Sequence, residues 1–193
     1  MTVAGCRSPP LFLVKLNKMD IQSVADIIHK MAEGFQGACV SCMHENAGRI
    51  RNLILEQLIA GQDSEGRHLT PTYDNDPFFE EEGFWHHRNA SYKAWKRTIT
   101  PQITGGQVLG LDPRPDEVPN LYIDGTFYGQ IDVSGMPEGL NVDAGTGNGP
   151  AIVGKYDEAG HNILGLGPSS KEYFLREFMI PCIDRFFKSC GYR

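Results

Sequence analysis

Two thiols and an imidazole in the run Cys39-x-x-Cys42-x-His44 are the first residues that could do chemistry. A structural zinc site needs four ligands from converging segments, and the sequence has neither a second Cys-x-x-Cys pair nor a His-x-x-x-His to complete one. A redox Cys-x-x-Cys begins a helix that follows a strand, whereas the residues before Cys39 have a helical pattern. We therefore expect both thiols to pack in the core on one helix face.

A second candidate is the pair His86-His87, which follows Glu80-Glu81-Glu82. Adjacent histidines point in different directions on a helix or strand, and the spacing here matches no known metal motif. We expect a surface pair and no bound metal. The alternative left open is a small metal-dependent hydrolase that uses His86 or His87 with nearby carboxylates.

A glycine-rich run, Gly145-Thr146-Gly147-Asn148-Gly149-Pro150, resembles a phosphate-binding loop only in its glycines. The Gly-Lys-Ser/Thr that holds phosphate is missing and no helix is expected to follow, so we predict a hairpin tip. The sequence also lacks a Gly-x-Ser-x-Gly nucleophile elbow. We therefore expect a protein that is not an enzyme, with no catalytic residues and no cofactor.

The charge changes sign along one segment. Residues 72–82 hold five carboxylates and no basic residue, whereas residues 84–101 hold four basic residues and no carboxylate. A solvated surface with local ion pairs would explain this pattern. The functional hypothesis is that the acidic segment of one subunit meets the basic segment of the next in a ring, and interleaved aromatic residues favour such a contact. The candidate subunit interface consists of Asp74, Asp76, Phe78, Phe79, Glu80, Glu81, Trp85, Arg88, Tyr92, Lys93, Trp95, Lys96 and Arg97.

Composition limits the broad class of protein. The chain has 193 residues, of which 40% are hydrophobic and 22% charged, which excludes general disorder, a coiled coil and a membrane bundle. A net charge of −6 argues against a dedicated nucleic-acid binder. Five cysteines, an odd number, favour reduced thiols in a cytosolic setting. The apolar runs are too short for a signal peptide or a membrane helix, so we expect no membrane partner.

Periodicity and capping residues predict the elements, and the expected fold class is α+β, with N-terminal helices and a C-terminal helix packed on a small antiparallel β-sheet. A flexible N-terminal arm over residues 1–19 is expected to precede a single domain over residues 20–193. The expected helices and the long loop are a helix from Asp20 to Gly34, a helix from about residue 38 to Gly61, a short helix within 84–99, a proline-rich loop over about 100–119 and a C-terminal helix. Short strands are expected at 121–123, 127–133, 140–142 and 152–154. Ser169-Ser170-Lys171-Glu172 has the capping-box pattern at the start of the C-terminal helix, which Pro181 should kink or divide.

Four stretches, read in order, resemble a known family. They are residues 57–66, 69–73, 121–128 and 163–166. Their order resembles small virion-morphogenesis proteins of tailed bacteriophages and prophages, in which a long helix ends in a Gln-Leu…Gly-x-Asp-x-x-Gly turn. In that family an x-Pro-x-Tyr segment and a Thr-Gly-x-Phe-Tyr strand entry come later. This chain departs from the pattern by having Gly125-Thr126 in inverted order and an acidic insertion before the basic segment.

The resemblance implies a viral structural protein of the head–tail connector or tail-completion type. It implies copies that form a homo-oligomeric ring, contact other phage neck and tail proteins, assemble in the cytoplasm of the bacterial host and end in the virion. DNA would at most pass through the assembled channel. The resemblance supplies no catalytic residues. A third hypothesis is a host-encoded binding module without a virion role.

Overall fold

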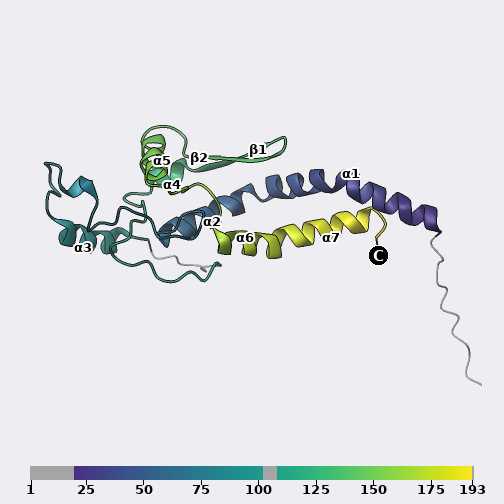
Figure 1. Ribbon diagram of the computed structural model, residues 1–193, viewed down its shortest axis with the longest axis horizontal. Coiled ribbons are helices and arrows are strands. Elements are labelled where there is room, and N and C mark those ends of the chain that lie inside the picture. Colours follow the sequence, from purple (N-terminus) through teal and green to yellow (C-terminus); the bar gives the residue numbers. More distant parts are fainter. Residues whose placement is uncertain (1–19, 102–107, 193) are drawn as a thin grey trace, which may run out of the picture.

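The chain forms an elongated molecule with a head at one end and a two-helix stalk at the other (Figure 1). The computed structural model describes residues 20–101 and 108–192. The elements are α1 (Ile21–Glu45), α2 (Ala47–Ile59), the 3₁₀ turn η1 (Pro77–Phe79), α3 (Asn89–Ile99), α4 (Thr126–Gln130), β1 (Asp132–Met136), β2 (Gly139–Asp143), α5 (Gly149–Glu158), α6 (Pro168–Phe174), the π-helical turn η2 (Leu175–Met179) and α7 (Ile180–Ser189). Helices with one small antiparallel sheet make the fold α+β, as predicted.

The first helix, α1, is longer than the sequence predicts. Asp20 caps it, since its Oδ1 accepts a hydrogen bond from the Ser23 N–H at 2.7 Å. Gly34 does not end the helix; it lies where α1 packs on α7, and a Cβ at this position would lie 2.7 Å from the Phe186 ring. The break comes at Asn46, whose side-chain amide donates to the Cys42 carbonyl at 2.8 Å. The expected helix end at Gly34 is wrong because the glycine serves close packing.

The sheet in the described residues is one hairpin, in which Asp132 pairs with Asp143 and Met136 with Gly139. It confirms the strand expected at 140–142. Of the other expected strands, 121–123 is irregular, 127–133 is mostly α4 with only its end in β1, and 152–154 lies inside α5. Tertiary burial overrides the β-propensity of these segments, which is a weak and context-dependent preference.

The C-terminal helix is divided, as Pro181 predicts. The π-helical turn η2 separates α6 from α7, and Pro181 lies in the first turn of α7, where a missing N–H costs little. The predicted capping box is wrong, because α6 begins at Pro168 with Gly167 as its N-cap. Ser170 instead donates its hydroxyl to Gln57 Oε1 at 3.1 Å and so ties α6 to α2.

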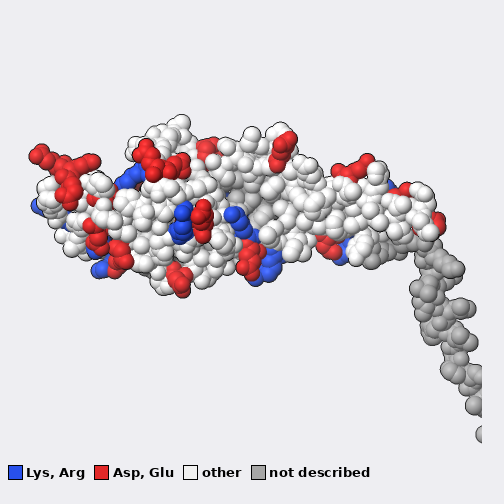
Figure 2. Space-filling model, in the orientation of Figure 1, with Lys and Arg blue, Asp and Glu red and all other residues white. Residues whose placement is uncertain are grey.

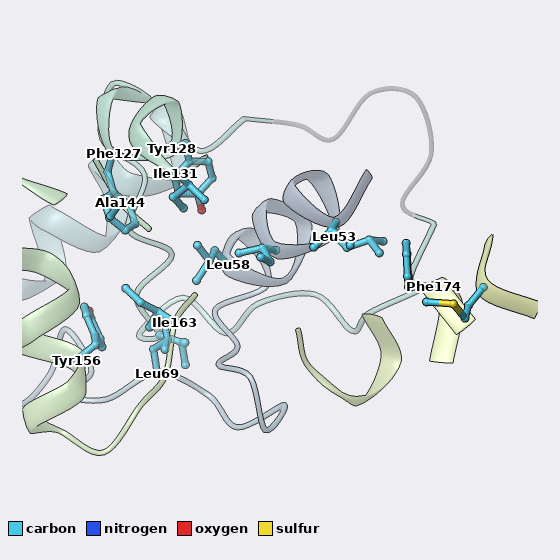
Figure 3. Packing of buried hydrophobic residues seen from close by; sticks show 14 of the residues in the cluster. Leu53, Leu58, Leu69, Phe127, Tyr128, Ile131, Ala144, Tyr156, Ile163 and Phe174 are labelled. Atoms are coloured by element: carbon cyan, nitrogen blue, oxygen red, sulfur yellow. The ribbon is translucent and has the colours of Figure 1, made fainter. Parts of the chain in front are cut away.

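The core joins segments that are far apart in the sequence. Leu58, Leu69 and Ile163 are fully buried and come from α2 and two connecting loops. Figure 3 shows them between Tyr156 on one side and the group from α4 and the hairpin on the other, with Leu53 and Phe174 farther along. The same cluster includes Cys42 and Met179, so the core of the head continues into the base of the stalk.

No described helix is long and apolar enough to cross a membrane. The arm expected at residues 1–19 lies outside the described residues. Of the loop expected at about 100–119, residues 108–119 are described and are irregular.

The end of α2 yields a stability prediction. Gly61 has φ 69°, and a Cβ there would lie 2.5 Å from Val118 Cγ1 and 2.9 Å from the Pro119 carbonyl oxygen. Gly61→Ala is therefore expected to lower the free energy of unfolding by about 2 kcal/mol or more, measured by chemical denaturation.

Gly37→Ala is the control for this substitution, because Gly37 lies inside α1 and a Cβ there meets nothing within 4 Å. It is expected to raise the free energy of unfolding by about 0.5–1 kcal/mol. Equal effects of the two substitutions would contradict the packing described for Gly61.

Candidate functional site

The acidic and basic segments fold against each other in one lobe of the head, which we call the aromatic lobe (residues 73–99). Lys93 Nζ lies 2.6 Å from Asp74 Oδ1. Asp76 pairs instead with Lys155 of α5 at 2.7 Å, and Arg97 pairs with Asp116. Part of the sequence's charge contrast is thus neutralised within the chain.

Aromatic rings hold the aromatic lobe together around Tyr92. Its ring centroid lies 5.0 Å from that of Tyr73, 5.2 Å from Phe79 and 5.0 Å from Trp85. The ring centroid of Trp95 lies 5.4 Å from that of Tyr92 and 5.3 Å from that of Trp85. Edge-to-face pairs at these distances stabilise beyond their buried area. The aromatic residues predicted for an interface therefore also form the lobe's own core.

Two of the predicted interface residues are buried. Phe79 and Lys96 are each 1% exposed, so neither can touch a partner in this fold. The Lys96 ammonium donates to the Tyr122 carbonyl. Burial, with the charge of the nearby Arg114 as the second cause, lowers the pKa of Lys96 to about 8. Lys96 thus links α3 to the loop around Tyr122 in the interior of the head.

Of the remaining predicted residues, some are half-buried and the others are exposed on the outer surface of the aromatic lobe. The half-buried ones are Asp76, Trp85, Tyr92, Lys93 and Trp95, and the exposed ones are Asp74, Phe78, Glu80, Glu81, Arg88 and Arg97. Phe78 is 44% exposed, and Phe84, which the sequence analysis did not select, is 72% exposed with the Arg88 guanidinium over its ring. Among the described residues, no basic group lies within ion-pair distance of Glu81. Figure 2 shows acidic side chains gathered at the tip of the head farthest from the stalk. This tip presents exposed rings beside unneutralised carboxylates.

A cavity of about 240 Å³ opens beside the aromatic lobe. Its walls are mostly aromatic and aliphatic, with the Asp76–Lys155 ion pair among them. Leu121 in the wall has φ 55°, a left-handed conformation that is unusual for leucine. The lining residues are Tyr73, Asp76, Phe78, Phe79, Tyr92, Lys96, Pro119, Leu121, Ile123, Ile152, Lys155 and Tyr156.

The two adjacent histidines lie in the aromatic lobe with their ring centroids 3.7 Å apart and their ring planes tilted by 41°. His86 Nδ1 is within hydrogen-bond distance of the Glu81 carbonyl, at 3.0 Å, and His87 Nδ1 lies 3.7 Å from Glu80 Oε2. Within residues 20–101 and 108–192, no three His, Cys, Asp or Glu side chains come together as a metal site would require. The geometry therefore gives the hydrolase alternative no observation in its favour.

A hydrogen-bonded set that sequence reasoning missed joins Thr70, His161 and Asp63. Thr70 Oγ1 lies 2.7 Å from His161 Nε2, and His161 Nδ1 lies 2.7 Å from Asp63 Oδ2. Burial alone raises the pKa of the Asp63 carboxyl, but hydrogen bonds from His161, Arg67 and Glu65 outweigh it and hold the pKa below its usual value. The spacing offers no signal, because 91 and 98 residues separate His161 from its two partners.

The order hydroxyl–imidazole–carboxylate is that of a nucleophilic triad, but its hydrogen bonds indicate a structural role. The Thr70 backbone N–H also donates to His161 Nε2 at 3.2 Å, so the nitrogen that a general base needs free is already occupied. Asp63 is fully buried and accepts from the backbone N–H groups of Glu65 and Arg67. The set fastens the turn after α2 to the loop after α5.

Gln57 forms a second buried set of hydrogen bonds next to the first. Its Nε2 donates to the Gly165 carbonyl at 3.0 Å, and its Oε1 accepts from the Gly167 N–H at 2.6 Å and from Ser170. Residues 57–66, 69–73 and 163–166 thus meet in one polar network. These three stretches therefore help to determine the fold in this region.

The glycine-rich run 145–150 is not a hairpin tip. The hairpin turns at Pro137 and Glu138, and the glycine-rich run leads directly into α5. A Cβ on Gly149 would lie 2.1 Å from the Ala144 carbonyl oxygen, so this glycine permits close backbone packing. The expectation that no helix follows the run was wrong.

The two cysteines of the Cys-x-x-Cys run pack as predicted. Cys42 is buried, and Cys39 is partly buried against the same cluster. Burial, with a hydrogen bond to Cys182 as the next cause, raises the pKa of the Cys42 thiol to about 12, which leaves it unreactive at neutral pH. His44 Nε2 lies 2.8 Å from the Gly139 carbonyl and so contacts the hairpin.

The stalk, formed by α1, η2 and α7, displays large apolar side chains. Ile21 is 89% exposed, Ile28 60% and Ile180 60%. Figure 2 shows that much of the visible face of the stalk carries few charged atoms. The exposed large apolar residues of this region are Ile21, Val24, Ile28, Phe35, Leu175, Ile180 and Tyr192.

Comparison with known proteins found no matching family model, no matching curated protein and no matching solved structure.

The burial of Lys96 predicts a pH effect. The folded chain releases this proton near pH 8 and the unfolded chain near pH 10.5, so the unfolded state binds more protons between these values and stability rises with pH. From pH 8 to 10, the free energy of unfolding of the parent is expected to rise relative to that of Lys96→Met by about 2 kcal/mol. Parallel pH profiles of the two proteins would contradict the buried position.

The buried hydrogen bond between Asp63 and His161 predicts that removing the imidazole lowers the stability of the fold. His161→Ala leaves the buried Asp63 carboxylate without its imidazole partner and is expected to cost about 2–3 kcal/mol in urea denaturation. Thr70→Val removes one exposed hydroxyl and is expected to cost about 1 kcal/mol. The control is His68→Ala at an exposed position, with an expected change within about 0.5 kcal/mol. Indistinguishable values for His161→Ala and His68→Ala would refute the role of the network.

Proposed function

We propose that this chain is a structural protein of a tailed-phage virion, of the head–tail joining or tail-completion type, which acts by assembling with copies of itself and with other neck or tail proteins. The observation that carries the proposal is the display of large apolar side chains at both ends of an elongated molecule, Ile21 and Ile28 on the stalk and Phe78 and Phe84 on the head. Surfaces of this kind mark contacts with other proteins.

The polar networks support this proposal over a catalytic one. The strongest hydroxyl–imidazole–carboxylate set is saturated by backbone hydrogen bonds, and the buried Lys96 is tied to a carbonyl. These groups position loops and keep the head rigid. The resemblance of residues 57–66, 69–73, 121–128 and 163–166 to phage morphogenesis proteins adds the virion setting.

We assign one contact of the proposed ring to the tip of the aromatic lobe. Phe84 and Phe78 supply apolar area there, and Glu81 supplies charge that no basic residue within 20–101 or 108–192 neutralises. A basic surface of the neighbouring copy would complement this charge and fix the register of the contact. Phe79 and Lys96 belong to the fold and not to this contact.

Substitutions at the aromatic-lobe tip should separate assembly from folding. Phe84→Ser removes the most exposed ring of the lobe and is expected to weaken oligomerisation at least tenfold while the melting temperature stays within about 2 °C. Mass photometry and a thermal scan measure the two effects. Met136→Ser, at another exposed apolar position on the hairpin, is the control and should change neither.

The opposite result, unfolding of Phe84→Ser or unchanged assembly, would remove the aromatic-lobe tip from the interface. Lys96→Glu does not test the interface, since reversing a buried charge is expected to unfold the head.

The proposal as a whole is tested in the phage or prophage that carries the gene. Proteomics of purified particles should find this chain in a constant ratio to the portal protein, and the genes on either side should encode portal, capsid or tail-tube proteins. Absence from purified particles, with metabolic genes on both sides, would overturn it.

A further inference from the structure

Two thiols from different helices meet where the stalk joins the head. Cys42 lies near the end of α1 and is 2% exposed, and Cys182 lies in the first turn of α7. The Cys42 thiol donates to the Phe178 carbonyl at 3.6 Å, and Phe178 lies about one helical turn before Cys182. A hydrogen bond also joins the Cys42 and Cys182 thiols. The packing of α1 on α7 thus brings together two sulfur atoms that are far apart in the sequence.

The two sulfur atoms differ in their surroundings. Cys182 is half-buried, and the guanidinium of the exposed Arg185 donates to its sulfur, with Nη2 3.1 Å away. Partial exposure beside a cationic group is the setting in which protein thiols react. Cys42 instead belongs to the core cluster and is shielded from solvent. An oxidant therefore reaches Cys182 first, and Cys42 is placed to react with the product.

We propose that Cys182 and Cys42 form a peroxide-sensitive thiol pair, which hydrogen peroxide converts into a disulfide between α7 and α1. The pair stays reduced in a reducing compartment, because disulfides persist only in oxidising surroundings. This proposal concerns a modification of the chain and does not depend on the proposed function.

The reaction balances with hydrogen peroxide as the oxidant. In the first step the Cys182 sulfur attacks one peroxide oxygen, an S–O bond forms, the O–O bond breaks, and the second oxygen leaves as water with the thiol proton. In the second step the Cys42 sulfur attacks the sulfenic acid on Cys182. The S–S bond forms, the S–O bond breaks, and the hydroxyl leaves as water with the Cys42 proton. The two thiols give up two electrons in total, and the peroxide takes up both.

The other two described cysteines lack this arrangement. Cys39 lies one turn before Cys42 and packs half-buried against the same cluster, and Cys190 directly follows α7. Within residues 20–101 and 108–192, neither sulfur has a hydrogen bond to a second thiol or to a guanidinium. Both cysteines therefore provide matched controls.

The disulfide would hold the start of α7 against the end of α1. Because the bond closes a long loop, it also restricts the unfolded chain, and this restriction favours the folded state. Oxidation would thus make the junction of stalk and head more resistant to unfolding.

The test treats the full chain with hydrogen peroxide in native buffer and analyses it by mass spectrometry. The expected product is a single chain that has lost two hydrogen atoms, with one link between the peptides of Cys42 and Cys182, and dithiothreitol should reverse the change. Cys42→Ala and Cys182→Ala should each lower the yield of this product about tenfold or more. Cys39→Ala and Cys190→Ala should change the yield less than about twofold.

Three results would overturn the proposal. They are peroxide treatment that yields no internal disulfide, a link in which Cys39 or Cys190 replaces Cys42, and the same yield from Cys182→Ala as from the parent. Circular dichroism shows whether each variant folds. The link is also mapped on the parent and on Cys39→Ala, so the pairing is tested even where Cys42→Ala does not fold.

Discussion

A helix that packs against only one other helix leaves apolar surface in water, and this constraint governs the molecule. At its base α1 is anchored in the core through Cys42, but from Ile21 to Phe35 the one helix beside it, among the described residues, is α7. Gly34 lets the two helices approach closely around the Phe186 ring, so one stripe of α1 is well buried. The neighbouring stripe, which includes Ile21 and Ile28, stays exposed within the part of the chain that the structure describes.

In the head, long irregular segments are held in place although the sheet is small. Buried polar groups that are fully paired hold them: Gln57 holds the loop before α6, and Asp63 with His161 holds the turn after α2. Such groups would be costly if left unpaired. The same saturation makes them poor catalysts, because their lone pairs and protons are already used.

Local signals in the sequence predict what depends on local physics. The Asp20 cap, the stop at Gly61 and the division at Pro181 follow from backbone conformation and hydrogen bonding within a few residues. Gly34 was mistaken for a helix end because a glycine that serves packing looks the same as one that serves a turn. The strand predicted at 152–154 is wrong because these residues lie inside α5, and β-propensity over three residues is a weak signal. In the candidate site, the aromatic cluster could be anticipated from composition, whereas the burial of Lys96 and the meeting of Asp63 with His161 depend on contacts distant in sequence.

The most direct measurement is hydrogen–deuterium exchange of the full chain at low and high protein concentration. If copies of the chain cover the exposed apolar residues of the stalk, such as Ile21 and Ile28, the backbone amides of residues 21–35 exchange more slowly as concentration rises, while those of α2, buried in the head of each copy, do not change. Exchange in residues 21–35 that is the same at every concentration would contradict the proposal that the exposed apolar residues of the stalk contact another copy.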